Sequence, residues 1–293
     1  MKGIILAGGA GTRLYPMTKV STKQLQPVYD KPMIYYPLSF LMLGGINDIL
    51  IISTPHDVPS FQELLGDGRH LGIKITYAVQ DTPNGLPEAF VLGEKFINGE
   101  DVTLILGDNL IYGNMDFFRD AVDNQIKHSS GFAARVFAYY VADPRAYGVV
   151  EFDPKSGKVV SLEEKPQKPK SNFAIPGLYL FDGSVSERAK KLKKSPRGET
   201  EIVDLIKSYH DEGKLGVEVM RRGIAWLDTG TPENLLEASA FIGAIEKRQG
   251  LKVACPEEIA LRMKYVTEEQ FVKNLELIPK SPYKEYLLRI LQG

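Results

Sequence analysis

The chain has 293 residues, a formal net charge of −1, and hydrophobic and charged fractions of 43% and 25%. That length suffices for one large α/β domain with an appendage, and the near-zero charge argues against a general nucleic-acid-binding surface. No apolar run reaches the ~20 residues of a membrane span, so we expect neither a nucleic acid nor a membrane as a partner. Met1 leads directly into an apolar strand, from which we expect no signal peptide, and Cys255 is the single cysteine. We therefore expect a cytoplasmic protein without an internal disulfide.

The first thirty residues hold the most informative pattern. Residues 3–6 are apolar and predict a short buried strand, and glycines follow at positions 8, 9 and 11. Glycine lets backbone N–H groups turn toward an anion without steric penalty. Arg13 and Lys23 add two cations behind the loop, as a polyphosphate would need. A tight strand-to-helix turn is the simpler alternative for the loop alone. Together with the two cations, it indicates a nucleotide phosphate site at the carboxyl end of the first strand.

Short apolar strands alternate with helices up to about residue 130. The predicted strands are 48–53, 73–79 and 102–106, and the predicted helices are 32–43, 58–65 and 86–96. This alternation is typical of a parallel, doubly wound sheet, in which ligands bind beyond the carboxyl ends of the strands. The glycine loop, Gln80 and Asp108 all fall at such ends. Their agreement strengthens the prediction of a ligand site there.

From residue 131 the pattern changes to strands with few helices between them. The predicted strands are 132–141, 148–152, 158–163 and 174–181, followed by helices 184–194 and 200–211 and a strand pair at 215–220 and 224–227. We expect this half to be more antiparallel and to extend or cover the edge of the sheet. Thr231 and Pro232 begin a long helix that ends at Gly250. Three amphipathic helical segments are predicted after it, at 256–264, 267–277 and 283–291.

Two aspartates stand out because each directly follows an apolar strand. Asp108 and Asp228 come from separate strand ends, and two such carboxylates can meet at a Mg²⁺ ion that substrate phosphates and water complete. A turn or helix cap is the commoner role for either aspartate alone, but their placement with the glycine loop favours metal binding. The four histidines show no zinc-like spacing, and no Ser-His-Asp arrangement is evident. Glycines, cations and aspartates without a nucleophile fit phosphoryl or nucleotidyl transfer.

Seven motifs resemble the sugar-phosphate nucleotidyltransferase family. In chain order they are Gly8-Gly-Ala-Gly-Thr-Arg13, Lys23-Gln-Leu, Gln80 with Gly85, Leu106-Gly-Asp108-Asn, Tyr147-Gly148, Glu163-Glu164-Lys165-Pro166 and Trp226-Leu-Asp228-Thr. The resemblance runs from Lys2 to about Leu291. Residues 21–38 and 251–258 resemble the branch of the family that transfers thymidylyl groups.

This resemblance implies both a fold and a reaction. The fold would be α/β, with a Rossmann-like mixed, mostly parallel sheet flanked by helices, a sugar-binding β-rich subdomain and a helical C-terminal extension. Residues 1–232 would form the catalytic domain, with a nucleotide-binding half (1–130) and a sugar-phosphate-binding half (131–232). The reaction would be Mg²⁺-dependent transfer from dTTP to α-D-glucose 1-phosphate, giving dTDP-α-D-glucose and diphosphate. It would be the first step of dTDP-L-rhamnose synthesis.

The resemblance also assigns roles to particular residues. Arg13, Lys23 and Lys165 would be catalytic, and Asp108 and Asp228 would bind the metal. The nucleotide would contact Gly8, Gly9, Ala10, Gly11, Thr12, Arg13, Lys23, Gln80, Gly85, Leu86 and Asp108. The sugar phosphate would contact Asn109, Tyr147, Gly148, Glu164, Lys165, Ile175, Arg197 and Trp226.

Regulation and assembly are expected to involve residues 233–293. The family resemblance implies a homotetramer and a second site, near residues 112–115 and 248–255, where dTDP-L-rhamnose (dTDP-rhamnose) acts as a feedback inhibitor. Asn114 stands where the family often has histidine, which affects the regulatory contacts only. Two alternatives stay open: UTP as the nucleotide, or a nucleotide-sugar sensor without turnover. The second is less consistent with the joint presence of two lysines and two aspartates.

Overall fold

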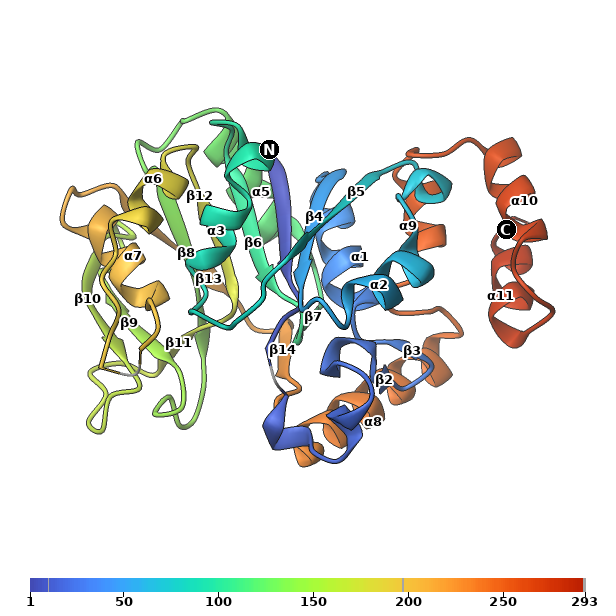
Figure 1. The fold of residues 1–293 in the computed structure, drawn as a ribbon, viewed down its shortest axis with the longest axis horizontal. Helices are drawn as coiled ribbons and strands as arrows, with labels where there is room; N and C mark the ends of the chain where they lie inside the picture. Colours follow the sequence, from blue (N-terminus) through green and yellow to red (C-terminus); the bar gives the residue numbers. More distant parts are fainter. Residues whose placement is uncertain (10, 197, 292–293) are drawn as a thin grey trace.

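The computed structural model describes residues 1–9, 11–196 and 198–291. Within them, ten strands form one mixed sheet with helices on both faces (Figure 1). From one edge to the other, the strands are β10 (Val159–Glu164), β9 (Gly148–Phe152), β11 (Phe173–Ile175), β8 (Ala134–Tyr140), β12 (Leu178–Phe181), β6 (Val102–Leu106), β1 (Lys2–Leu6), β4 (Asp48–Ser53) and β5 (Lys74–Val79), with β13 (Leu215–Met220) paired to β8. The predicted α/β fold class is confirmed.

The two halves of the sheet differ in strand direction, as predicted. β1 is parallel to both β4 and β6, and β5 is parallel to β4. On the other side of β6, strands β12, β11, β9 and β10 pair in antiparallel fashion, while β13 is parallel to β8. The second half therefore extends the sheet. The carboxyl ends of β1, β5 and β6 bring the glycine loop, Gln80 and Asp108 to one edge.

Eleven α-helices occur in the described part of the chain. They are α1 (Tyr35–Leu43), α2 (Val58–Leu65), α3 (Glu88–Leu92), α4 (Glu94–Ile97), α5 (Asp116–Ile126), α6 (Val185–Lys190), α7 (Ile202–His210), α8 (Pro232–Gln249), α9 (Pro256–Arg262), α10 (Glu268–Glu276) and α11 (Pro282–Ile290). None of them is long and apolar enough to cross a membrane.

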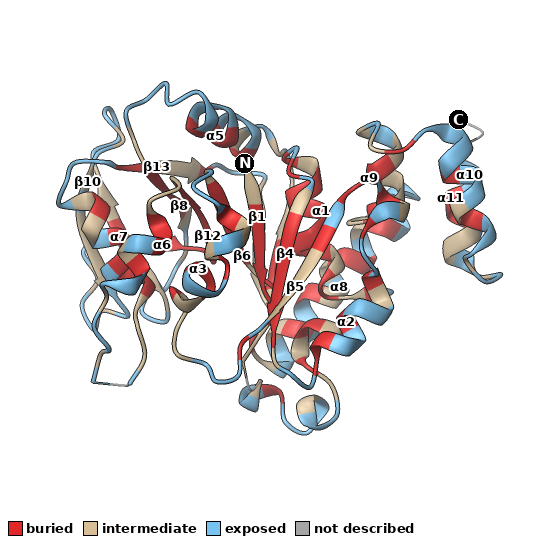
Figure 2. Cartoon of the chain, turned by 45° about the horizontal axis from the view of Figure 1, so that its top comes forward, coloured by how far each residue is buried: buried red, intermediate tan, exposed pale blue. Residues whose placement is uncertain are grey.

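Alternation along β1 divides the core between the two faces of the sheet. Successive side chains of a strand point to opposite faces, and Ile4 and Leu6 belong to a core shared with Phe90 of α3. Ile5 belongs to the other core, which includes Leu38 of α1. Burying each such side chain contributes roughly 1.5–3 kcal/mol. Figure 2 shows these buried strands between helices whose outer sides are exposed.

The N-terminal segment after the glycine loop packs against α8 in a third core. Leu14, Val28 and Met33 meet Leu235 and Ile242 of that helix. The predicted cap of α8 is confirmed, because Thr231 accepts a hydrogen bond from the Asn234 backbone N–H. Helices α10 and α11 lie at one end of the molecule (Figure 1), where they pack against α9 and add Phe271 and Leu287 to the core that contains Ile5.

Two predicted elements are interrupted in the structure. The strand expected at 174–181 is two strands, β11 and β12, separated by Pro176 and Gly177. Proline has no N–H for the ladder, and a Cβ at Gly177 would lie 2.5 Å from Leu106. The helix expected at 86–96 is likewise two short helices, α3 and α4, which meet at Gly93.

A third predicted element starts later than expected. The helix expected at 32–43 begins only at Tyr35, because Pro32 belongs to a short strand, β3 (Lys31–Pro32), paired with β2 (Pro27–Val28).

The predicted strand pair at 215–220 and 224–227 is wrong in its pairing. β13 joins the large sheet, whereas β14 (Ala225–Asp228) pairs with β7 (Asn109–Tyr112) in a separate two-stranded sheet. β7 had no clear signal of its own, because it follows β6 across only Gly107 and Asp108. Its pairing with β14 brings the two candidate metal-binding aspartates together.

Candidate active site

The glycine loop lies against Gln80 at the carboxyl end of the sheet. A Cβ placed on Gly8 would be 3.0 Å from Gln80 Oε1, and the Gln80 side chain is buried. Gly11 has a left-handed backbone, and its carbonyl accepts a hydrogen bond from Thr18 Oγ1 at 2.9 Å. Ala10, also predicted to contact the nucleotide, lies outside the described residues. The loop thus lies directly against the residue that follows β5.

Gly85 allows a second loop to approach the chain near residue 200. Its φ is +105°, and a Cβ would lie 1.9 Å from the carbonyl oxygen of Thr200, so only glycine fits. The Thr200 backbone N–H donates to the carbonyl of Asn84 at 2.8 Å. This contact holds Gly85 and Leu86 beside the sheet edge.

Four charged side chains, Arg13, Lys23, Asp108 and Asp228, form what we call the active-site cluster. Lys23 Nζ contacts Asp108 Oδ2. A Cβ on Gly230 would be 2.8 Å from Arg13 Nη2 and 3.2 Å from Asp228 Oδ1, so the guanidinium lies beside that carboxylate.

Pairing of β7 with β14 explains how the two aspartates meet. Asp228 is the register partner of Asn109, the residue after Asp108. Thr229 Oγ1 then donates to the carbonyl oxygen of Asp108 at 2.9 Å. Burial and the negative charge of Asp108 raise the pKa of Asp228, and the cations of Lys23 and Arg13 only partly oppose this. A divalent cation would relieve this repulsion, so the carboxylates fit the predicted metal.

The number of protein ligands is small. Among the described residues, no group of three His, Cys, Asp or Glu side chains is placed to hold a metal ion. The two aspartates would thus leave most coordination positions to phosphate oxygens and water, which is the usual arrangement for Mg²⁺ in phosphoryl-transfer sites.

A cavity of about 310 Å³ adjoins the cluster and collects most of the predicted residues. Those that line it are Arg13, Leu86, Asp108, Asn109, Tyr147, Gly148, Glu164, Lys165, Ile175, Trp226 and Asp228. The glycine loop, Thr12, Lys23, Gln80 and Gly85 do not line it. Arg197 lies outside the described residues. The cavity therefore corresponds to the predicted sugar-phosphate half, with the nucleotide half along the open sheet edge.

One wall of the cavity is built from paired strands. Gly148 is the register partner of Glu164 on β10 and of Ile175 on β11, and a Cβ there would lie 3.4 Å from Glu164 Oε2. Lys165 has a left-handed backbone with φ 45°, which costs energy for a residue other than glycine. Its N–H donates to the carbonyl of Tyr147 at 3.0 Å, and its Nζ lies 3.5 Å from Glu164 Oε1. The strained turn thus directs a half-exposed ammonium group to the cavity.

Asn109 and Trp226 hold the floor of the cavity together. Asn109 Oδ1 accepts from Trp226 Nε1 at 2.7 Å and from the Gly177 N–H at 3.0 Å, and Asn109 Nδ2 donates to Asp108 Oδ1 at 3.0 Å. The ring of Tyr147 packs edge-on against Trp226. Burial, followed by the charge of Asp228, raises the pKa of Tyr147.

The sequence analysis did not identify several residues that belong to this site. Ile202, Val203 and Ile206 of α7 form an apolar side of the cavity. Their spacing matches one face of a helix, a signal that indicates packing without indicating a ligand. Glu88, which holds Gln80, was also missed.

A second cavity, of about 520 Å³, lies between α1, β7 and the segment after α8. Its lining includes Tyr112, Gly113, Met115 and residues 249 and 251–255, which is where the regulatory site was predicted. Arg119, Lys252 and Arg262 give it three cations. Cys255, at the end of this lining segment, is a buried residue whose Sγ lies 3.1 Å from Tyr283 Oη, and burial raises the pKa of its thiol, as expected for a structural cysteine.

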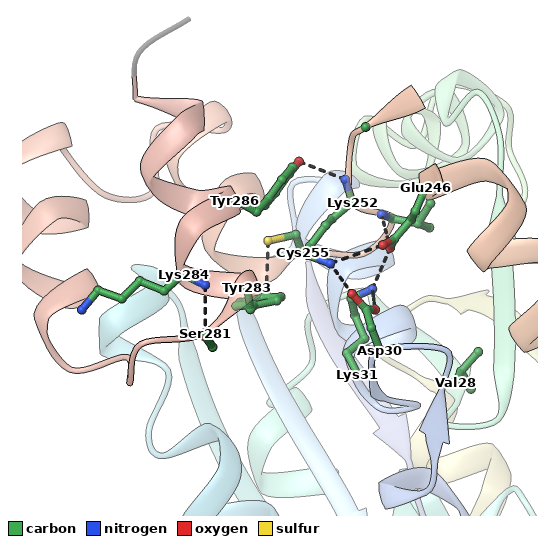
Figure 3. Close-up of polar contacts among 12 residues, drawn as sticks. Val28, Asp30, Lys31, Glu246, Lys252, Cys255, Ser281, Tyr283, Lys284 and Tyr286 are labelled. Atoms are coloured by element: carbon green, nitrogen blue, oxygen red, sulfur yellow. Dashed lines mark hydrogen bonds and ion pairs between the residues drawn. The ribbon is translucent and has the colours of Figure 1, made fainter. Parts of the chain in front are cut away.

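Beside this cavity, Asp30, Lys31, Glu246 and Lys252 form a second set of four charges (Figure 3). We call it the buried cluster after its two buried members, Lys31 and Glu246. Glu246 Oε1 accepts from Lys31 Nζ and from the Val253 N–H, both at 2.8 Å. Lys31 and Lys252 both contact Asp30. The cluster joins the N-terminal segment to the end of α8.

Comparison with known proteins assigns this arrangement to a family. Residues 2–244 match the family described as nucleotidyl transferase. The chain belongs to the nucleotidyl transferase family. Over 293 residues it is 54% identical to the glucose-1-phosphate thymidylyltransferase of Mycobacterium tuberculosis (strain ATCC 25618 / H37Rv), with 100% of this chain and 99% of the relative covered. The family resemblance inferred from the motifs is thereby confirmed.

Solved structures of similar proteins share the fold. A Bacillus anthracis protein, described as a candidate glucose-1-phosphate thymidylyltransferase in complex with a sucrose, has a TM-score of 0.75 and 39% identity, covering 82% of this chain and 94% of its own. A UDP-glucose pyrophosphorylase complexed with UDP-glucose has a TM-score of 0.73 and 24% identity, covering 85% and 99% respectively, and shows the fold alone. The chain is thus an enzyme of the nucleotidyl transferase family, whose members generally use a divalent metal.

Proposed function

We propose that this chain transfers a thymidylyl group from dTTP to α-D-glucose 1-phosphate, giving dTDP-α-D-glucose and diphosphate. The observation that carries this proposal is the single cavity in which Lys165 and Glu164 face Arg13, Asp108 and Asp228. A sugar phosphate bound by Lys165 would lie next to a nucleotide α-phosphate bound at the active-site cluster. The full-length similarity to a glucose-1-phosphate thymidylyltransferase supports the choice of substrates.

The reaction needs no protein base. A phosphate monoester has a second pKa of about 6, so glucose 1-phosphate is mostly a dianion at neutral pH. One of its oxygens attacks the α-phosphorus and forms a new P–O bond, while the bond from the α-phosphorus to the β-phosphate oxygen breaks and diphosphate leaves. Arg13 and Lys23 hold the triphosphate and the departing diphosphate, and Lys165 holds the attacking phosphate. These cations offset anion repulsion and keep the attacking and leaving oxygens in line.

Asp108 and Asp228 are the residues that would hold Mg²⁺. Bound there, Mg²⁺ supplies positive charge to the phosphate oxygens of the nucleotide. On the nucleotide side, residues 8–12 would lie along the phosphates, and Gln80, Gly85 and Leu86 would contact the thymine. On the sugar side, Glu164 would accept hydrogen bonds from the sugar hydroxyls. The remaining wall residues are Asn109, Tyr147, Gly148, Ile175 and Trp226, and Arg197 would be a further contact of the sugar phosphate.

Diphosphate release over a matrix of nucleotides and sugar phosphates, with and without Mg²⁺, tests this function. We expect the highest kcat/KM with dTTP and glucose 1-phosphate, and some turnover with UTP, because one methyl group discriminates by only about 1–3 kcal/mol. A preference for UTP would replace the nucleotide assignment. Release with no pair would leave a nucleotide-sugar sensor as the alternative.

The cavity of about 520 Å³ supports a regulatory site on the same chain. We propose that dTDP-L-rhamnose, the end product of the pathway that this reaction would begin, binds there and inhibits. Its diphosphate would face Arg119 and Arg262, because Lys252 is already paired with Asp30 and Glu246. Residues 233–293 would support a homotetramer of a cytoplasmic enzyme. Arg119→Gln should weaken inhibition about tenfold, on the scale of one charge-assisted hydrogen bond, with Arg69→Gln on the exposed surface as the control. Unchanged inhibition in Arg119→Gln would contradict the regulatory site. A monomeric mass by light scattering would contradict the homotetramer.

A further inference from the structure

Glu88, in the first turn of α3, accepts hydrogen bonds at both of its carboxylate oxygens from the loop before it. Oε2 accepts from Gln80 Nε2 at 2.6 Å and from the Asn84 backbone N–H at 3.3 Å. Oε1 accepts from Asn84 Nδ2 at 2.8 Å. A carboxylate accepts hydrogen bonds and donates none. The part of the Gln80 amide that faces Glu88 is therefore its NH₂ group, and the amide cannot rotate without losing this bond.

The other end of the Gln80 amide faces the nucleotide side. Oε1 points to the glycine loop, where a Cβ on Gly8 would be 3.0 Å away. Within residues 1–9, 11–196 and 198–291, no group donates a hydrogen bond to this oxygen. Because the amide is planar, fixing Nε2 on Glu88 also fixes Oε1 as the atom presented to a ligand.

The backbone N–H of Gly85 is a possible hydrogen-bond donor to the same ligand that Gln80 Oε1 faces. It has no hydrogen-bond acceptor in the described part of the chain. Its position is set by Asn84, whose carbonyl accepts from both the N–H and Oγ1 of Thr200, at 2.8 and 3.0 Å. Glu88 thus holds both members of the pair, Gln80 through its side chain and Gly85 through Asn84.

We propose that Glu88 is a positioning residue that selects the class of nucleobase by fixing the Gln80 amide. With Oε1 presented, the site accepts a base with an imide N–H, such as thymine or uracil, and rejects cytosine, whose N3 carries a lone pair. A mismatched base leaves a buried acceptor facing a second acceptor, which is costly. This inference rests on the proposed function, in that it needs Gln80 to contact the base. It also implies that Glu88 has no part in separating dTTP from UTP, because both are imides.

Four versions of the full chain test the inference: unmutated, Glu88→Met, Glu88→Gln and, as a control, Glu94→Met. Methionine matches the length of glutamate and removes both acceptors. Glutamine retains one acceptor for Gln80 and the Asn84 N–H. Glu94 lies on the neighbouring helix α4 and contacts exposed Lys190. We measure kcat/KM for dTTP, UTP and dCTP with glucose 1-phosphate.

In the unmutated chain we expect a strong preference for dTTP over dCTP. Glu88→Met should lower that ratio by about tenfold or more, the scale of one hydrogen-bond preference. The ratio of dTTP to UTP and the KM for glucose 1-phosphate should not change. Glu88→Gln should stay within about threefold of the unmutated ratio, and Glu94→Met should equal it. A merely structural role for Glu88 would lower all three kcat/KM values together, and an unchanged dTTP to dCTP ratio would overturn the assignment.

Two further measurements keep the test decisive. If Glu88→Met does not fold, the side-chain amide resonances of ¹⁵N-labelled Gln80 in the unmutated chain decide: slow solvent exchange is expected, and fast exchange would overturn the assignment.

N3-methyl-dTTP separates this inference from the proposed function. If the unmutated chain uses it as well as dTTP, Gln80 does not contact the imide and the base contact in the proposed function fails. If N3-methyl-dTTP is rejected while Glu88→Met keeps its ratio, only the role of Glu88 fails.

Discussion

The active-site cluster and the buried cluster each contain two cations and two carboxylates, yet they use them differently. In the buried cluster, Lys31 and Glu246 have side-chain exposures of 2% and 6%, and each carboxylate contacts both lysines. Burial acts to raise the pKa of Asp30, but the hydrogen bonds from Lys252 and Lys31 outweigh it, and the pKa of Asp30 is lowered. In the active-site cluster, burial and the negative charge of Asp108 instead raise the pKa of Asp228.

This difference separates a structural charge cluster from one built for ligands. The buried cluster satisfies its charges internally and joins the segment after the glycine loop to α8. The active-site cluster leaves like charges close together, so it gains from a divalent cation and phosphate groups. Residues 23–31 contribute to both clusters, with Lys23 at one end and Asp30 and Lys31 at the other. The stability of one cluster thus supports the position of a cation in the other.

The largest effect is expected from breaking the buried cluster. Glu246→Gln removes the charge that faces Lys31, and the loss of one partner from a buried ion pair costs about 3–5 kcal/mol. Urea denaturation measures this as a lower free energy of unfolding. The double variant Lys31→Met/Glu246→Leu should recover much of the loss, because no unpaired charge remains at that pair. Equal instability of the single and double variants would show that packing, rather than charge, governs this region.

Asp228→Asn should affect turnover instead of folding. Loss of one metal ligand should reduce kcat by about 10²–10³, the scale of a lost preorganised electrostatic contact. The folded-state pKa of Asp228 is raised, so its contribution to stability is present below pH 3.8 and is lost as pH rises through the raised value. Without metal at pH 7, the variant should therefore be at least as stable as the unmutated chain. Retained kcat with unchanged Mg²⁺ dependence would contradict the metal assignment.

Asp30 should show the opposite dependence on pH. Its folded-state pKa is lowered, so its contribution is present above pH 3.8 and is lost as pH falls through the lowered value. Asp30→Asn should accordingly destabilise the chain at pH 7, and the difference from the unmutated chain should shrink below pH 4. Denaturant titrations at pH 7 and pH 3 measure both differences. A difference that grows in acid would reverse the sign argued for the buried cluster.

The smallest effect is expected at an exposed pair outside both clusters. Lys127 and Asp123 lie four residues apart on the surface and are 67% and 66% exposed. Lys127→Met should change the free energy of unfolding by about 0.5 kcal/mol or less. Any larger change would mean that ordinary surface charges matter here, and the contrast with Glu246 would then lose its meaning.

The sequence allowed the sheet and the glycine-loop end of the site to be predicted, because apolar strands, turn residues and strand-end aspartates are local signals. It did not allow contacts between distant segments to be predicted. Lys31 and Glu246 are 215 positions apart, and nothing near either residue indicates the other. The pairing of β7 with β14 was missed for the same reason, because it also joins segments far apart in the chain. The hydrogen bond from Gln80 to Glu88 was missed because it joins two polar side chains without an apolar period.

The central claim, that a sugar-phosphate oxygen attacks the nucleotide α-phosphorus, has a direct test. Glucose 1-phosphate labelled with ¹⁸O in its three non-bridging oxygens is incubated with dTTP, Mg²⁺ and the enzyme, and ³¹P NMR isotope shifts locate the label. We predict that all the label stays in dTDP-glucose, including the oxygen between its α- and β-phosphorus atoms, and that the diphosphate carries none. Label in the diphosphate, or an unlabelled bridging oxygen in the product, would contradict the mechanism.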